Sequence, residues 1–158
     1  MVSNGDPLIQ QWFPSLSPDD FEITSPEDPA YNCIAWAAGK TDRWWQAVRA
    51  AGYYWPDDLP WDDRIDTLVR VFESVGFEVC DSDVVEPGYE KVAIYGQGDE
   101  YLHAARLLQS GKWTSKLGAY KDIEHNNLQG LTSDVYGSVV KLLRKHNLAP
   151  PDTTPEMK

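Results

Sequence analysis

Cys33 and His103 are the two residues whose types suit nucleophilic catalysis by a thiol. Such chemistry needs a thiolate, a base that generates it and a third group that orients the base. Cys33 lies near the start of the run 31–39, which predicts a short buried helix stopped by Gly39. The free N–H groups at a helix start favour the thiolate, because they lower the pKa of a thiol. The preceding Asn32 offers an amide that either caps this helix or donates a hydrogen bond to an oxyanion.

Both residues also fit a purely structural role. Cysteine is among the most buried residue types, so the helix around Cys33 is equally typical of a core segment. His103 lies in the apolar run 101–105, where a histidine is often a hydrogen-bonded core residue. Cys80, in a short apolar strand, is expected to be a plain core residue.

His103 lies on the first strand of a predicted hairpin. The strand candidates 101–108 and 112–117 are joined through Ser110-Gly111, a dipeptide typical of a turn. Side chains on the return strand can therefore face the imidazole of His103 across the strand pair.

The length of this turn decides which side chain faces the imidazole. Ser115 faces His103 if the turn contains three residues, whereas a two-residue turn places Thr114 or Lys116 on that face. Asp122, just past the return strand, is the rival orienter, because a carboxylate stabilises an imidazolium better than a hydroxyl does. The sequence leaves both alternatives open.

The order of these residues along the chain resembles that of the papain-like superfamily. The segment 32–37 (Asn-Cys-Ile-Ala-Trp-Ala) looks like the family's nucleophile helix, and the segment 103–105 looks like its histidine strand. The segment 114–118 (Thr-Ser-Lys-Leu-Gly) resembles the Asn-Ser-Trp-Gly segment of papain-type proteases, with Ser115 in place of the orienting Asn. The resemblance covers about residues 31–118, and the chain length is nearer to compact branches such as the NlpC/P60 amidases.

This resemblance implies a papain-like fold, in which the helix that carries Cys33 packs on a central antiparallel sheet. It implies a peptidase, amidase, deamidase or transglutaminase that needs no cofactor and acts on a peptide, a protein or another amide. Cys33 would attack an amide or thioester carbonyl, and His103 would then protonate the leaving group. Water or an amine would resolve the acyl-enzyme.

The predicted elements by themselves favour the α+β class with an antiparallel sheet at its centre. An amphipathic helix is predicted over 63–75, capped by Asp62 or Asp63 and ended by Gly76. A last helix, capped by Ser133, is predicted from the apolar positions Val135, Val139, Leu142 and Leu143. The strand candidates are 77–80, 91–95, 101–108 and 112–117.

The chain of 158 residues fits a single domain, which we expect to span residues 1–148. Residues 1–30 are rich in Pro, Asp and Ser and predict an irregular lead-in. Apolar side chains are expected to pin this lead-in to the core, namely Leu8, Trp12, Phe13, Phe21 and Ile23. The Pro-rich segment 149–158 predicts a disordered tail.

Aromatic residues crowd the segment 44–61. They either wall a substrate cleft or form a lid over the core, since both uses suit large aromatic side chains. The candidate substrate-binding residues are Trp36, Trp44, Trp45, Tyr54 and Trp55. The carboxylates nearby predict a solvated turn and helix start, because they lack the spacing of a calcium loop: Asp57, Asp58, Asp62, Asp63 and Asp66.

The chain has a formal net charge of −11 and a sequence pI of about 4.5. This charge argues against binding to nucleic acids and to anionic membranes, because both need clustered Lys and Arg. It also supports an alternative to the enzyme. In that alternative the chain is a catalytically inactive papain-like module that binds a basic protein partner.

The N-terminal residues contain no basic stretch followed by an apolar run, and no run approaches the ~20 apolar residues of a membrane-spanning helix. We therefore expect a cytoplasmic protein whose two cysteines are reduced. No metal site is expected, because structural zinc sites use closely spaced ligand pairs and none exists among Cys33, Cys80, His103 and His125.

Overall fold

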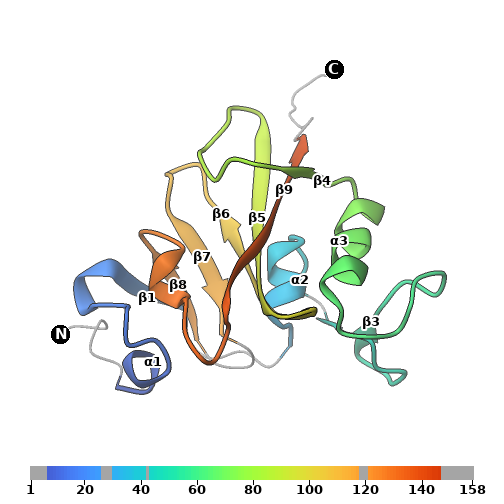
Figure 1. Ribbon diagram of the computed structural model, residues 1–158, viewed down its shortest axis with the longest axis horizontal. Coiled ribbons are helices and arrows are strands. Elements are labelled where there is room, and N and C mark those ends of the chain that lie inside the picture. The colour runs from blue at the N-terminus through green and yellow to red at the C-terminus, as the bar shows by residue number, and fades with distance from the viewer. Residues whose placement is uncertain (1–6, 26–29, 42, 118–120, 147–158) are drawn as a thin grey trace.

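A seven-stranded sheet forms the centre of the computed structural model, which describes residues 7–25, 30–41, 43–117 and 121–146 (Figure 1). Each described pair of neighbouring strands in this sheet is antiparallel. The predicted α+β class with a central antiparallel sheet is therefore confirmed. In spatial order the strands are β1 (Phe21–Ser25), β8 (Asp122–His125), β7 (Trp113–Lys116), β6 (Glu100–Leu107), β5 (Tyr89–Gln97), β9 (Ser138–His146) and β4 (Glu78–Cys80).

Short helices and turns surround the sheet. Figure 1 shows two of the helices, α1 and α3, on opposite sides of the long strands β5 and β9. A separate parallel pair of two-residue strands, β2 (Trp44–Trp45) and β3 (Tyr53–Tyr54), lies in the aromatic segment. The helical elements are α1 (Pro7–Trp12), η2 (Pro18–Asp20), α2 (Cys33–Ala37), α3 (Ile65–Ser74) and η3 (Gln129–Leu131).

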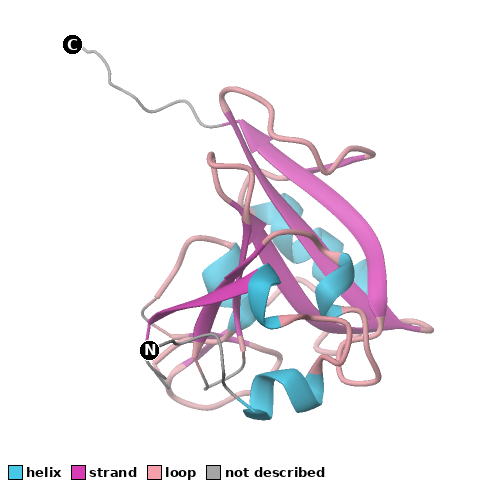
Figure 2. Ribbon diagram, turned by 90° about the vertical axis from the view of Figure 1, so that its left-hand side faces the viewer, coloured by secondary structure: helices cyan, strands magenta, loops and turns pink. Residues whose placement is uncertain are grey.

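The central sheet buries apolar side chains on both of its faces. Alternate residues of a strand point to opposite faces, so Val92 and Ile94 of β5 pack with α2 and α3. Ala93 and Tyr95 of the same strand pack with α1. Figure 2 shows helices on both sides of the long, twisted strands. A polar side chain in the middle of this sheet is therefore enclosed on either face, and it needs a partner within the protein.

The β6–β7 hairpin fixes the register that the sequence leaves open. The backbone N–H of Leu108 donates to the carbonyl of Lys112 at 2.9 Å, which leaves residues 109–111 as the turn. The strands keep this register further along the hairpin. With three residues in the turn, Ser115 takes the same face as His103.

The two predicted inner helices both form. α2 begins at Cys33, and Gly39, with φ of 84°, follows its last turn as predicted. α3 is likewise followed by a left-handed glycine, Gly76, with φ of 104°. The start of α3 differs from the prediction, because its N-cap residue is Arg64. The Asp62 carboxylate, predicted as a cap, accepts a hydrogen bond from the N–H of Arg64 at 3.1 Å instead.

The predicted last helix is wrong, because the chain forms strand β9 there. Ser133 and Gly137 pair through two backbone hydrogen bonds of 2.7 and 3.1 Å, and this turn sends the chain back along β5. β9 then pairs with β5 over nearly its whole length and with β4 on its other side. Strand pairing satisfies the backbone groups of β5, which would otherwise form an open edge, and it overrides the helical spacing of the apolar residues.

The lead-in is more regular than predicted. Within residues 7–25 the chain forms α1, η2 and β1, and β1 pairs with β8, a strand that the sequence did not predict. Among the apolar side chains expected to pin this region, Phe13 and Phe21 are buried, Trp12 and Ile23 are half-buried, and Leu8 is exposed. The predicted tail, 149–158, lies outside the described residues.

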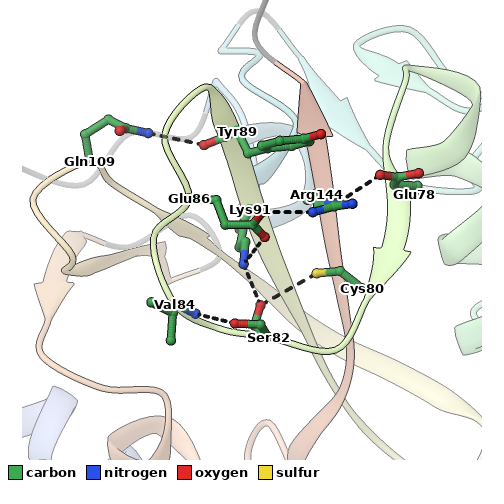
Figure 3. Close-up of polar contacts among 9 residues, drawn as sticks. All are labelled: Glu78, Cys80, Ser82, Val84, Glu86, Tyr89, Lys91, Gln109 and Arg144. Atoms are coloured by element: carbon green, nitrogen blue, oxygen red, sulfur yellow. Dashed lines mark hydrogen bonds and ion pairs between the residues drawn. The ribbon is translucent and has the colours of Figure 1, made fainter.

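A chain of ion pairs holds the loop 81–88 against the sheet (Figure 3). The buried Lys91 ammonium of β5 lies 2.8 Å from a carboxylate oxygen of Glu86 and 2.9 Å from the carbonyl oxygen of Ser82. Arg144 of β9 binds Glu86 and Glu78, each at 2.9 Å. The buried cation is thus paired, as it must be in the interior. These charged residues therefore have a structural role, which is to hold the loop on the sheet.

Cys80 lies beside this network at the edge of the sheet. Its thiol is half-buried and lies 3.6 Å from the carbonyl oxygen of Ser82 (Figure 3). The sequence predicted a plain core residue, but β4 is an edge strand, and an edge strand leaves one side of its residues open to solvent.

The turn before β9 yields a test of this fold. Gly137 has φ of 71°, and a Cβ atom at this position would collide with the carbonyl of Gly96. We expect Gly137→Ala to lower the free energy of unfolding by about 3 kcal/mol. This cost combines an alanine in the left-handed backbone region with the clash of its Cβ atom against the backbone of β5.

Gly98→Ala is the matched control, because Gly98 has φ of 56° and open space around the same Cβ position. It should cost only about 1 kcal/mol. Chemical denaturation measures both variants, and equal losses would contradict the close approach of Gly137 to β5.

Candidate functional site

Asn32 fixes the start of the helix that carries Cys33. Its side-chain oxygen accepts hydrogen bonds from the backbone N–H groups of Ala35 at 3.1 Å and Trp45 at 3.0 Å. Its side-chain nitrogen donates to the carbonyl of Trp45 at 3.1 Å. Asn32 therefore caps α2 and ties it to the aromatic segment.

Cys33 is the first residue of α2 and is half-buried. Burial raises the pKa of its thiol to about 11, although three backbone N–H groups and the Lys116 cation act to lower this pKa. Those N–H groups belong to Ala104, Ile34 and Cys33 itself. Desolvation thus outweighs the effect of the helix start, and the thiol is protonated at neutral pH.

His103 is fully buried in β6. Its Nε2 atom lies 3.0 Å from the hydroxyl oxygen of Ser115, and its ring stacks on Tyr136 with centroids 4.0 Å apart. Its Nδ1 atom is buried without a hydrogen-bond partner. Burial lowers the pKa of His103 well below its ordinary value, and His125 lowers it further. His103 is therefore a neutral imidazole with one ring nitrogen unused.

Ser115 connects His103 to a second buried histidine. The Ser115 hydroxyl oxygen lies 2.8 Å from Nε2 of His125, and Nδ1 of His125 lies 2.9 Å from the carbonyl oxygen of Asn127. Burial lowers the pKa of His125 to about 4, and the contact with Asn127 raises it only in part. Two neutral imidazoles and one hydroxyl thus form a continuous hydrogen-bonded chain from β6 across β7 to β8.

Asp122, the rival orienter, has partners other than His103. Its carboxylate accepts a hydrogen bond from the Tyr31 hydroxyl at 3.1 Å and lies 4.0 Å from the ammonium of Lys116. Lys116 and Asp122 are both buried. Of the two candidates for orienting His103, Ser115 is the one that contacts the imidazole.

Cys33 and His103 come from adjacent elements, since α2 packs against β6 and β7. The sulfur faces the backbone N–H of Ala104, the residue that follows His103. Among the contacts of the described residues, no hydrogen bond joins the thiol to the imidazole, and Nδ1 of His103 has no other partner. The structure thus places the two groups on neighbouring elements without a preformed thiol–imidazole bond.

The aromatic candidates divide between core and surface. Trp45 and Trp55 are buried in the core beside α2, whereas Trp36, Trp44 and Tyr54 are half-buried. Trp55 is held in place, because its indole N–H donates to the carbonyl of Pro60 at 2.8 Å. The aromatic segment therefore covers the core, with Trp36, Trp44 and Tyr54 left partly accessible.

The sequence suggests no catalytic role for three residues around this site: Tyr31, His125 and Tyr136. It offers Lys116 only as a side chain that would face His103 after a two-residue turn, whereas in the structure its ammonium acts on the Cys33 thiol. The signal for Lys116 was its place in the middle of the run 113–117, where a charged residue is either paired or functional. His125 carried no comparable signal, because β8 was not predicted. Tyr136 has no such signal either, because the sequence predicts a helix over its segment.

The described residues contain no group of three or more side chains that could hold a metal ion. In the part of the chain that the structure describes, no helix is long and apolar enough to cross a membrane.

These features define an α+β protein with a half-buried cysteine at a helix start beside a buried histidine–serine–histidine chain. Residues 22–144 match the family described as a domain of unknown function, DUF7689, so the chain belongs to that family. No curated protein and no solved structure matches the chain.

The buried histidines predict that acid destabilises the fold. An unfolded His125 binds a proton below about pH 6.5, while the folded one stays neutral down to about pH 4. The unfolded state therefore binds more protons between these values, and stability falls as the pH falls. Complete protonation of this one group costs on the order of 3 kcal/mol, from 1.36 kcal/mol per pKa unit.

The measurement is the free energy of unfolding by denaturant between pH 7.5 and pH 4. The matched variant is His125→Gln, which retains polar atoms and removes this titration. Its stability should depend less steeply on pH than that of the unmodified chain. Parallel pH profiles for the two proteins would show that His125 is not buried in its neutral form.

Proposed function

We propose that this protein is a papain-like enzyme that transfers acyl groups from an amide or thioester, with Cys33 as nucleophile and His103 as base. The observation that supports this most is the state of His103. Ser115 holds one ring nitrogen, and the other keeps its lone pair in a buried position with no partner. A structural histidine in the interior normally satisfies both nitrogens, whereas a base needs one of them free.

The raised thiol pKa favours proton transfer during attack over a preformed ion pair. The imidazole takes the thiol proton as the sulfur bonds to the carbonyl carbon, and the carbonyl π electrons move to the oxygen. When the carbonyl re-forms, the C–N or C–S bond breaks, and the leaving group takes the proton from the imidazolium. Water or an amine then attacks the acyl-enzyme by the same steps, and the thiol is restored.

The positive groups near the sulfur suit the negative charge that develops in this reaction. Backbone N–H groups of Cys33 and Ile34 stand at the start of α2, and the buried Lys116 ammonium also acts on the thiol. In this proposal these groups stabilise the oxyanion, because preorganised donors in a site that excludes water stabilise such a charge strongly. Asn32 serves indirectly, since its side chain holds the helix start.

The proposal covers peptidase, amidase, deamidase and transglutaminase chemistry, because the same residues serve all four. The substrate is a peptide, a protein or another amide, which the half-buried Trp36, Trp44 and Tyr54 would contact. No cofactor takes part in these steps. Both cysteines are free thiols, which suits work in a reducing compartment such as the cytoplasm.

A second candidate is an inactive papain-like module that binds a basic protein. The thiol pKa of about 11 and the formal net charge of −11 favour this alternative. A thiol that is protonated at neutral pH reacts slowly with electrophiles unless a base assists it. The two candidates therefore differ in whether His103 controls the reactivity of Cys33.

Alkylation of Cys33 by iodoacetamide distinguishes them. The experiment uses a Cys80→Ala background, in which Cys33 is the one remaining thiol. We expect His103→Ala to lower the alkylation rate at pH 7 by about 100-fold, the lower end of the usual contribution of a general base.

Ser115→Ala is expected to lower the same rate by about tenfold, the effect of one hydrogen bond. Asp122→Asn is the control for the rival orienter and should change the rate less than Ser115→Ala does. A rate that rises only toward pH 11 and is the same with and without His103 would contradict the enzyme and favour the binding module.

A further inference from the structure

The contact between His103 and Ser115 does not by itself determine which ring nitrogen of the neutral imidazole carries the proton. A hydroxyl both donates and accepts hydrogen bonds, so it can pair with Nε2 of His103 whether or not that nitrogen carries the proton. An orienting amide or carboxylate oxygen differs from a hydroxyl, because it only accepts. A base positioned by a serine therefore needs a further group that fixes the direction of the serine hydroxyl.

His125 supplies that direction. The carbonyl of Asn127 can only accept, so Nδ1 of His125 carries the proton and donates across 2.9 Å. Because the pKa of His125 is lowered, its ring is neutral and its Nε2 atom can only accept. The Ser115 hydroxyl must then donate across 2.8 Å to this nitrogen.

The same logic continues to His103. With its proton directed at His125, Ser115 can only accept from Nε2 of His103 across 3.0 Å. The neutral His103 ring therefore carries its proton on Nε2 and a lone pair on Nδ1, the buried atom that has no partner. His103, Ser115 and His125 are each 0% exposed, so bulk water cannot reverse the direction of these hydrogen bonds.

We propose that His125 is a positioning residue that fixes the tautomer of His103 through Ser115. This inference rests on the proposed function in one respect, namely that Nδ1 of His103 acts as the base for Cys33. The carbonyl of Asn127 anchors the chain, and the direction of three successive hydrogen bonds follows from that one acceptor. Loss of His125 would free the Ser115 hydroxyl to donate to His103, which would move the imidazole proton to Nδ1.

The tautomer of His103 is measured directly by nitrogen NMR of the full chain labelled with ¹⁵N-histidine, since a protonated ring nitrogen and an unprotonated one have well-separated shifts. In the unmodified protein we expect His103 to carry its proton on Nε2. In His125→Phe, which keeps a planar ring and removes the acceptor, we expect the Nδ1-protonated form to appear. In His125→Gln, which restores an acceptor near the same place, we expect the original tautomer.

Alkylation of Cys33 in the Cys80→Ala background gives the second readout. We expect His125→Phe to lower the rate at pH 7 about tenfold, and His125→Gln to restore most of it. A variant that was merely destabilised would not show this rescue together with the matching change of tautomer.

Ser115→Ala provides an independent test, since it removes the link without enlarging any side chain. In Ser115→Ala we expect the Nδ1-protonated form of His103 to appear. The ¹⁵N shifts of His125 should remain those of a ring protonated on Nδ1. If His125→Phe does not fold, Ser115→Ala therefore still tests whether the hydrogen-bonded chain fixes the tautomer of His103.

The outcomes separate the inference from the function on which it rests. An Nδ1-protonated His103 in the unmodified protein, or one tautomer throughout the folded variants, overturns the role of His125. If the tautomers change as expected but His103→Ala leaves the alkylation of Cys33 unchanged, the proposed function fails. His125 then controls the tautomer of a histidine that is not a base.

Discussion

The hydrogen-bonded chain from His103 through Ser115 to His125 is the interaction on which the site depends. It crosses three neighbouring strands, β6, β7 and β8, and it lies within a sheet that is covered on both faces. Buried polar groups must be paired inside the protein, so the register of these strands is tied to the geometry of three side chains. A shift of one residue in β7 would turn Ser115 to the other face and leave the Nε2 atoms of both buried imidazoles without this partner.

The same enclosure sets the electrostatics of the site. Burial keeps both histidines neutral and raises the pKa of the Cys33 thiol, so the resting state holds no thiolate–imidazolium pair. The charges that remain inside are paired, as Lys116 with Asp122 near the site and Lys91 with Glu86 at the other end of the sheet show. Such a site favours a mechanism in which charge appears only as the substrate reacts, and nearby donors then stabilise it.

The sequence predicted the parts of this arrangement that local signals control. Gly39 and Gly76 marked helix ends, and the turn at Ser110-Gly111 limited the choice of partner for His103. The site beyond Ser115 could not be predicted, because it depends on strand pairing between distant segments. β9 carries apolar residues at helical spacing, but it pairs as a strand with β5 on one side and β4 on the other. β8 is four residues long, so nothing local showed that His125 would lie beside Ser115.

The measurement that tests the central claim most directly is the ¹⁵N shift of His103 Nδ1 before and after Cys33 is alkylated in the folded protein. If the thiol and this nitrogen work together, modification of the sulfur changes the Nδ1 shift. His146 serves as the internal control, because it pairs with Tyr89 at the far end of β5 from His103 and its shifts should stay constant. A His103 Nδ1 shift that is the same before and after alkylation would contradict the pairing of Cys33 with His103.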